Sequence, residues 1–441
     1  MEIDKLQMKD SGIPWLGEIP RGWKITRVKY CFSNVKEIVG GKVDNYERLA
    51  LTMNGVVKRS KDDSTGLQPD KFETYQILRP NELVFKLIDL QNVSTSRVGL
   101  SPYLGIVSPA YIILKCNNNI DPKFAEKYFL MMWKNHIFNA LGDAGVRSSL
   151  SSTDLLELPI VLPPIDEQRQ IAVFLEKKCV EIDELIFLHE QQIERLKAYN
   201  QSIITEAVTK GVNNLTSKLN GGGYKLSHNL FAVPVKDSGI AWVGKIPTDW
   251  LVVPLYCLYT ERKNINSLGK ENNLLSLSYG KVIQKDININ ECLLPCNYNG
   301  YNIVESDDII IRPTDLQNDK RSLRTGLVKK RGIITSAYIA LKPKSDINSN
   351  YYHYLLHSYD IKKVFYNMGN GVRQGLNYDE FSKLMVLVPS KAMQKAIAYY
   401  LDHKCAEIEQ IIADKDTQLD MLDEYKKSLI YEYVTGKKEA A

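Results

Sequence analysis

Residues that could carry out catalysis occur in this 441-residue chain, but their spacing matches no active-site motif. No G-x-G-x-x-G follows a strand pattern and no G-x-x-x-x-G-K-[ST] occurs, so we expect no phosphate-cradling loop. The Asn/Asp-Pro-Pro-aromatic motif of amino-methyltransferases is missing too. Glu176–Lys178 and Glu424–Lys426 have the Glu-x-Lys spacing of nuclease sites, but no partner acids are near them in sequence. We interpret both as solvated helix faces and predict no catalytic residues.

Candidate metal ligands are equally sparse. His353 and His357 lie one helical turn apart, and Cys292 and Cys296 share a spacing of four, but the further ligands of zinc sites are missing. We therefore predict no metal site. The seven cysteines are scattered, and no secretory signal or membrane-spanning apolar run is evident. This pattern favours a cytoplasmic protein.

Basic side chains suggest binding chemistry instead. The stretch KRSLRTGLVKKR holds six cations in twelve residues: Lys320, Arg321, Arg324, Lys329, Lys330 and Arg331. Such density suits phosphate contacts and the recognition of guanine by arginine, although a solvated surface is the alternative. The equivalent stretch of the first half has only Arg97, and VKRSK supplies Lys58, Arg59 and Lys61 there.

Two further elements, each present twice, are candidates for DNA contact. In the GVR elements, glycine permits close backbone approach and Arg147 or Arg373 could reach a phosphate or base; the alternative is an arginine that ties down a turn. The DLQN elements and the residues before them add Lys86, Asn92, Arg312 and Asn318.

The segments that must position these side chains are duplicated. KDSGIPWLGEIPRGW (Lys9–Trp23) and KDSGIAWVGKIPTDW (Lys236–Trp250) share ten of fifteen residues, including both tryptophans. At an offset of 226 to 227 residues the match continues almost to the end of the chain. This period is too long for a solenoid, so each copy should have its own core. We expect KDSGI to form an entry strand or turn, with base reading as the alternative.

Each copy has two parts. The first, about 15–164 and 242–389, is typical of a mixed α/β domain, with strand patterns such as GIVSPAYIILK and helix patterns over Phe124–Leu141 and Tyr351–Met368. The second is one long helix without internal Pro or Gly. We therefore predict an α/β domain at 1–165, a helix at 166–210, a Gly/Asn/Ser-rich linker at 211–235, an α/β domain at 236–390 and a helix at 391–436.

The two long helices carry near-heptad apolar stripes. Cys179 and Cys405 accompany the main packing residues, which are Leu175, Ile182, Ile186, Ile193, Leu196 and Ile203 in the first helix and Leu401, Ile408, Ile412, Leu419, Leu422 and Leu429 in the second. A helix of 42 residues is about 63 Å long, too long to bury its stripe within one small domain. We expect the helices to form an antiparallel coiled coil that separates two pseudo-symmetric domains, an α+β architecture.

The succession of LxxDLQN, GVR and LPIVLPPIDEQRQIAVFLEKKCVEIDELI closely resembles the specificity subunit of type I restriction–modification systems. The resemblance covers essentially the whole chain. The second copy, LMVLVPSKAMQKAIAYYLDHKCAEIEQII, is looser: it has Ser390 and Lys391 in place of Pro164 and Ile165, and only Gln394 of the Glu-Gln element survives.

The resemblance implies a non-catalytic subunit in which each domain recognises one half of a bipartite DNA target. It implies that the helices set the spacer and dock two methyltransferase subunits, and that nuclease–translocase (restriction) subunits complete the assembly. S-adenosylmethionine, ATP and Mg²⁺ would be bound only by those partners.

Two other classes of function remain as alternatives. A methyltransferase–nuclease fusion would need the catalytic motifs that are missing above. A coiled-coil scaffold for proteins alone would not need a six-cation cluster or divergent loops on matched domains. A steep fall of DNA affinity with salt would distinguish DNA recognition from such a scaffold.

Overall fold

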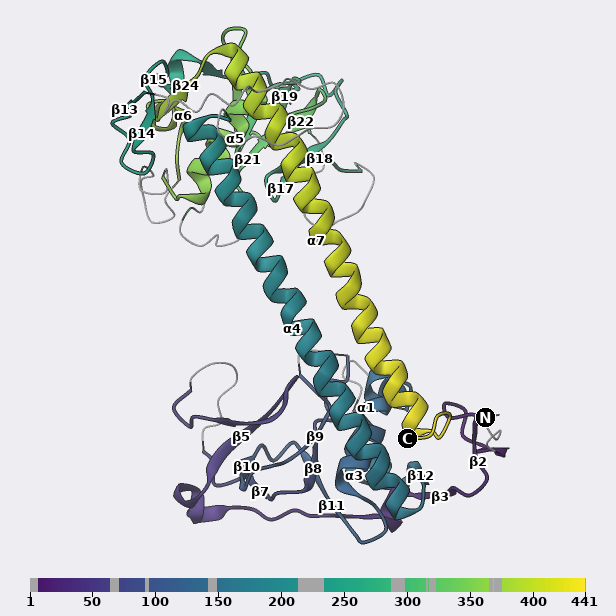
Figure 1. Ribbon diagram of the computed structural model, residues 1–441. Coiled ribbons are helices and arrows are strands. Elements are labelled where there is room, and N and C mark those ends of the chain that lie inside the picture. The colour runs from purple at the N-terminus through teal and green to yellow at the C-terminus, as the bar shows by residue number, and fades with distance from the viewer. Residues whose placement is uncertain are drawn as a thin grey trace. The chain divides into compact units, whose positions relative to one another are not determined.

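The computed structural model describes residues 7–63, 71–91, 95–141, 149–212, 234–286, 298–314, 316, 323–364, 368 and 375–440. The chain divides into two compact units: unit 1 comprises Met1–Glu190 and Asp416–Ala441, and unit 2 comprises Gln191–Lys415. Each unit holds one α/β domain and part of each long helix, α4 (Ile165–Lys210) and α7 (Lys391–Val434) (Figure 1). The boundaries expected from sequence gave the helices segments of their own, whereas the compact units divide both helices.

Unit 1 contains two four-stranded sheets, in the orders β6-β5-β10-β7 and β4-β11-β8-β9, and the pairs β1-β2 and β12-β3. All pairings are antiparallel except that of β10 with β5. The strands are β1 (Met8–Asp10), β2 (Glu18–Pro20), β3 (Lys24–Arg27), β4 (Phe32–Asn34), β5 (Glu47–Thr52), β6 (Gly55–Arg59), β7 (Gln76–Leu78), β8 (Glu82–Phe85), β9 (Val98–Leu100), β10 (Gly105–Val107), β11 (Ile112–Cys116) and β12 (Pro159–Leu162). The helices are η1 (Val28–Tyr30), η2 (Gly40–Asn45), α1 (Pro122–Lys134), α2 (Ile137–Leu141) and α3 (Ser152–Glu157).

Unit 2 repeats this plan with one four-stranded sheet, β16-β23-β20-β21, and four two-stranded pairs, β13-β14, β15-β24, β17-β18 and β19-β22. Its strands are β13 (Val235–Asp237), β14 (Lys245–Pro247), β15 (Leu251–Pro254), β16 (Tyr259–Glu261), β17 (Leu275–Ser278), β18 (Lys281–Gln284), β19 (Asn302–Val304), β20 (Ile309–Ile311), β21 (Thr325–Leu327), β22 (Gly332–Ile334), β23 (Ile339–Pro343) and β24 (Met385–Val388). Its helices are η3 (Leu255–Cys257), α5 (Ser349–Ile361) and α6 (Tyr378–Phe381). Mixed α/β domains in two copies and long helices confirm the predicted fold class.

The KDSGI elements form the same strand and turn in both copies. Asp10 Oδ1 accepts a hydrogen bond from the Gly12 amide at 2.9 Å, and Asp237 Oδ1 accepts one from the Gly239 amide at 2.9 Å. Both glycines have positive φ, which glycine adopts without steric cost. These side chains shape the turn, as expected from the sequence.

The central strands are fully buried, as their continuous apolar runs predict. Every residue of β8 and of β20 is buried. Two glycines in each copy permit close packing of a strand on the neighbouring hairpin. A Cβ on Gly105 would lie 2.5 Å from the carbonyl oxygen of Glu47, and one on Gly332 would lie 2.4 Å from that of Asn273.

One helix expected from the sequence is divided. The pattern over Phe124–Leu141 forms α1, which ends at Lys134, and the separate helix α2. His136, between them, has a φ of 57°, in the left-handed region that does not continue an α-helix. At the other end, Asp121 caps α1 by accepting hydrogen bonds from the amides of Lys123 and Phe124.

The long helices are antiparallel, and each unit shows this independently. In unit 1, the rings of Phe174 and Tyr433 stack at 4.4 Å, and Lys426 pairs with Asp183 nine residues further along α4. As residue numbers rise on α4 they fall on α7. In unit 2, Lys415 Nζ donates to Gln192 Oε1 at 2.5 Å, while Gly211, just past α4, lies against Met393.

Candidate nucleic-acid interface

The first DLQN element follows β8, and a buried arginine donates hydrogen bonds to the backbone of its loop. Arg97 precedes β9 and is only 1% exposed. Its guanidinium donates to the carbonyl oxygens of Ile88, at 3.5 Å, and Asp89, at 2.5 Å. Leu90 anchors the loop in the core, whereas Ile88, Asp89 and Gln91 are exposed. The loop therefore presents Ile88, Asp89 and Gln91 to solvent while Leu90 and the Arg97 hydrogen bonds hold its backbone.

The second copy uses the same device. Arg324 precedes β21, is 0% exposed, and donates to the carbonyl oxygens of Arg312, at 3.3 Å, and Thr314, at 2.6 Å. Leu316 is the buried anchor. The guanidinium groups of Arg97 and Arg324 are buried against loop carbonyl oxygens, so the prediction that they contact DNA is corrected to a role inside the domains. Both act on the conformation of the DLQN loops.

The remaining cations of unit 1 lie around the β5–β6 hairpin. Lys58 pairs with Glu47 at 2.6 Å, Arg59 pairs with Asp63 at 2.7 Å, and Lys61 Nζ donates to a backbone carbonyl oxygen at 2.7 Å. Lys58 is about half exposed. The hydrogen bond and charge of Glu47 raise the pKa of Lys58, so this side chain stays protonated at neutral pH.

The β5–β6 hairpin packs against β9, the strand that follows Arg97, because a Cβ on Gly99 would lie 3.2 Å from Val56 Cγ2. Burial raises the pKa of the Tyr111 phenol, and the positive charges of Arg48, Arg59 and Arg97 oppose that shift. Lys86 Nζ donates to Thr95 Oγ1 at 3.2 Å, two residues before Arg97, and burial, then the charge of Arg97, lowers the pKa of Lys86. The VKRSK and DLQN candidates of unit 1 thus belong to one region of the domain.

In unit 2, Lys329, Lys330 and Arg331 are exposed at the start of β22. Arg331 pairs with Glu271 at 2.9 Å and with Glu305 at 2.5 Å, and these carboxylates raise its pKa. Arg312 is partly exposed. Six further candidates lie outside the described residues: Asn92, Arg147, Asn318, Lys320, Arg321 and Arg373.

A buried glutamine ties each long helix to its domain. Gln168 of α4 is 1% exposed; its Oε1 accepts from the Asp121 amide at 2.8 Å, and its Nε2 donates to the Pro163 carbonyl oxygen at 2.9 Å. Gln394 of α7 accepts from the Asn348 amide and donates to the Pro389 carbonyl oxygen, both at 3.0 Å. Asp121 and Asn348 cap α1 and α5. This shared role explains why Gln394 is retained when the rest of the Glu-Gln element is not.

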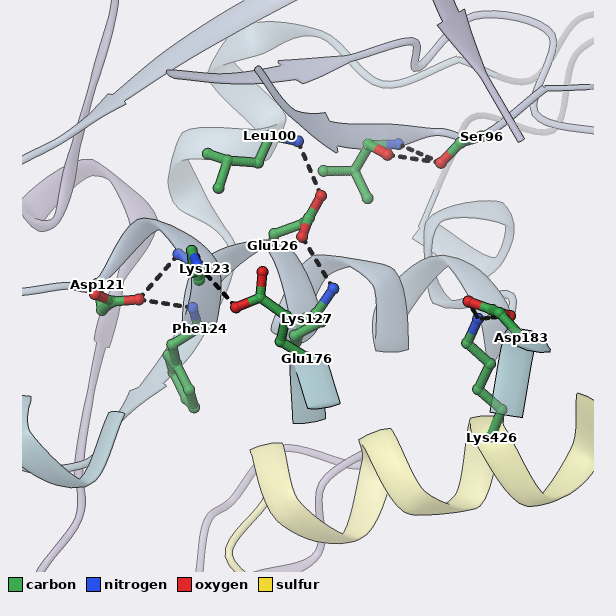
Figure 2. Close-up of polar contacts among 11 residues, drawn as sticks. Ser96, Leu100, Asp121, Lys123, Phe124, Glu126, Lys127, Glu176, Asp183 and Lys426 are labelled. Carbon is green, nitrogen blue, oxygen red and sulfur yellow. Dashed lines mark hydrogen bonds and ion pairs between the residues drawn. The ribbon is translucent and has the colours of Figure 1, made fainter. Parts of the chain in front are cut away.

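Charged contacts reinforce this junction in unit 1. Figure 2 shows Lys123 of α1 paired with Glu176 of α4 at 2.7 Å, so this acid of the Glu-x-Lys pattern has a structural partner. Glu126, beside Lys127, accepts from the Leu100 amide at 3.0 Å and so joins α1 to β9. Helix α1 is thereby linked to β9, the strand that directly follows Arg97.

The predicted packing residues of α4 and α7 occupy the inner faces of the helices, but their surroundings differ from the expectation. Leu175, Ile182 and Leu429 are buried in one core with the domain of unit 1, and Ile203, Leu401 and Ile408 in one core with that of unit 2. Partly buried residues extend these cores: Ile186, Leu422, Leu196 and Ile412. Ile193 is buried and Leu419 is half-buried. The stripe ends thus pack against domains as well as against the other helix.

Among the described residues, no three His, Cys, Asp or Glu side chains are grouped to hold a metal ion. Within the same residues, no helix is long and apolar enough to cross a membrane. Burial lowers the pKa of His353 to about 3 and that of His357 to about 4, and the paired rings lie 6.2 Å apart on α5. Cys292 and Cys296 lie outside the described residues.

A model of the type I restriction modification DNA specificity domain matches residues 28–198 and 281–418, more than half of the chain. The chain belongs to this family. Two Methanocaldococcus jannaschii relatives are each 24% identical to it. The match to a protein named for the specificity subunit of type I restriction enzyme MjaX covers 96% of this chain and 95% of the relative. The match to the MjaVIII specificity subunit covers 76% and 74%.

A solved structure from a study of complex assembly and conformational transition in a type I restriction–modification system contains a chain of similar fold. The TM-score is 0.66 at 12% identity, covering 95% of this chain and 99% of that one. This likeness concerns the fold, and the match of the family model confirms the sequence-based identification of the family.

Sequence inspection missed two features of this family member. Gln168 and Gln394 had been seen only as parts of a motif, although their shared position after a proline was a usable signal. The polar residues at the base of the β17–β18 hairpin also escaped notice, because no cation run marks them.

Proposed function

We propose that the chain is the non-catalytic subunit that selects DNA for a type I restriction–modification complex, with each α/β domain recognising one half of a bipartite sequence. The main support is that the two α/β domains have matching buried residues at equivalent positions of the β5–β6 and β17–β18 hairpin regions, whereas exposed residues there differ. Leu49, Leu51 and Val56 of unit 1 have their equivalents in Leu275, Leu277 and Val282 of unit 2. By contrast, exposed Tyr103 stands where unit 2 has Lys330.

The long helices would set the spacer between the half-sites and dock two methyltransferase subunits. An exposed apolar stripe on α4 supports docking: Val173, Val180 and Phe187, spaced by seven residues, are 64%, 53% and 57% exposed. Tyr399, at 47%, is the repeat equivalent of Val173 on α7. The α7 equivalents of Val180 and Phe187 are Ala406 and Ala413, so the faces offered to two copies of one partner are alike at one of the three positions. The methyltransferase would supply S-adenosylmethionine chemistry, and restriction subunits would supply ATP- and Mg²⁺-dependent cleavage.

Salt dependence of DNA binding tests this proposal against a protein-only scaffold. The full chain, co-purified with its methyltransferase, should lose DNA affinity steeply as salt rises, with a slope of about −0.9 per phosphate neutralised. Replacing Lys329 and Lys330 together by Gln should reduce the slope by about 2 without changing the preferred sequence. A complex that binds no DNA at low salt would instead support the scaffold.

A further inference from the structure

The β5–β6 hairpin of unit 1 and the β17–β18 hairpin of unit 2 are equivalent residue by residue. In unit 1, buried Leu49 of β5 pairs across the strands with Lys58 of β6. In unit 2, buried Leu275 of β17 pairs with Gln284 of β18. Since both leucines are fixed in the core, Lys58 and Gln284 hold the same position in the two domains.

The adjacent residues are equivalent as well. Gly105 packs against the backbone of Glu47, and Gly332 packs in the same way against that of Asn273. Four neighbouring positions can therefore be compared directly: Tyr46, Glu47, Lys58 and Arg59 in unit 1 correspond to Asn272, Asn273, Gln284 and Lys285 in unit 2. Three of the four differ in charge or aromatic character, whereas Arg59 and Lys285 are both cations, on a frame that is otherwise retained.

In unit 1 these positions form an ion pair under an aromatic ring. Lys58 pairs with Glu47, and its ammonium group lies 5.3 Å from the centre of the Tyr103 ring. A paired lysine and glutamate offer a neighbouring molecule opposite charges rather than amide groups.

In unit 2 the same positions line a hollow of about 560 Å³ whose walls are Asn272, Asn273, Gln284, Lys285 and Asp286. Small-molecule pockets are mostly apolar, whereas every described residue that lines this hollow is polar. Asn273 Nδ2 donates to the Arg331 carbonyl oxygen at 2.5 Å, which fixes the amide. Its Oδ1 is buried and, among the described residues, accepts no hydrogen bond. A buried acceptor without a donor indicates a missing partner.

We propose that these four positions determine sequence specificity, and that the amide-lined hollow of unit 2 reads the edge of an A·T base pair. Asparagine and glutamine side chains pair with adenine through one donor and one acceptor. The exposed amides of Asn272 and Gln284 supply both groups. Lys329 and Lys330, which are exposed just before β22, would contact phosphates. The inference rests on the proposed function and assigns it to particular residues.

The test uses the full chain co-purified with its methyltransferase and a DNA library randomised in both half-sites. The double variant Asn272→Ala/Gln284→Ala should lose discrimination at one or two positions of one half-site by about 5- to 150-fold, corresponding to one bidentate contact. The other half-site and the salt slope should be retained. Asn264→Ala, an exposed amide whose backbone pairs with Asn302 and Ile303 of β19 and which does not line the hollow, is the matched control.

Gln284→Glu keeps the side-chain shape while removing the donor, and should shift preference from adenine toward cytosine, whose amino group a carboxylate accepts. Unchanged preference in both variants, or equal loss in both half-sites, would overturn the inference. If the unaltered complex selects no bipartite sequence at all, the proposed function itself fails, which is a distinct result.

Discussion

Gln168→Ala should detach α4 from the domain of unit 1. The side chain is 1% exposed and makes three hydrogen bonds to backbone groups: those of Asp121 at 2.8 Å, Pro163 at 2.9 Å and Asn119 at 3.2 Å. Each buried backbone group left without its partner costs about 1 kcal/mol or more. We therefore expect the free energy of unfolding of unit 1 to fall by about 3 kcal/mol.

Hydrogen exchange of the full chain is the most direct assay, because Gln168 Oε1 accepts from the Asp121 amide itself. That amide and the first turn of α1 should lose protection, while α5 in unit 2 should not. Gln170→Ala is the matched control: the same substitution two residues along α4, on an exposed side chain. If the two variants differ by less than about 0.5 kcal/mol, the anchoring role is refuted.

Three other perturbations test separate parts of the structure. Gly332→Ala should destabilise unit 2 by about 1–3 kcal/mol in denaturant titrations, because the new Cβ would lie 2.4 Å from the Asn273 carbonyl oxygen; Gly300→Ala, with open space around it, should not. Burial lowers the pKa of His353 to about 3 and that of His357 to about 4. The contribution of the two neutral histidines to the free energy of unfolding is therefore fully present above pH 6.5. It should fall by up to about 1.4 kcal/mol per pH unit per histidine as the pH drops toward 4. Replacing both by Phe should flatten the stability–pH curve. Val173→Asp/Phe187→Asp should lower the co-purified methyltransferase from two copies per chain to one without altering circular dichroism, and Glu190→Gln should retain both copies; two copies retained by the double variant would place docking elsewhere.

The repeat could be predicted from sequence because identity is concentrated in residues that shape the backbone. The KDSGI turns, the paired tryptophans and the long uninterrupted helices are local or periodic features, and all were predicted. His136 was not recognised as a break, since a positive φ at a non-glycine residue leaves little sequence signal.

The candidate site was less predictable because burial is a tertiary property. Arg97 and Arg324 count as cations in any sequence window, yet both guanidinium groups point to loop carbonyl oxygens inside the domains. The equivalence of Lys58 with Gln284 was hidden for the opposite reason. Alignment by identity fails where the copies diverge, and only the strand register restores it.

The most direct test of DNA selection is a genome-wide map of methylated adenines in cells that express the methyltransferase, with and without this chain. The account predicts that removing the chain eliminates one interrupted, two-part motif, and that exchanging residues 15–164 for those of another family member changes one half of it only. An unchanged map in cells that express both proteins would contradict the account.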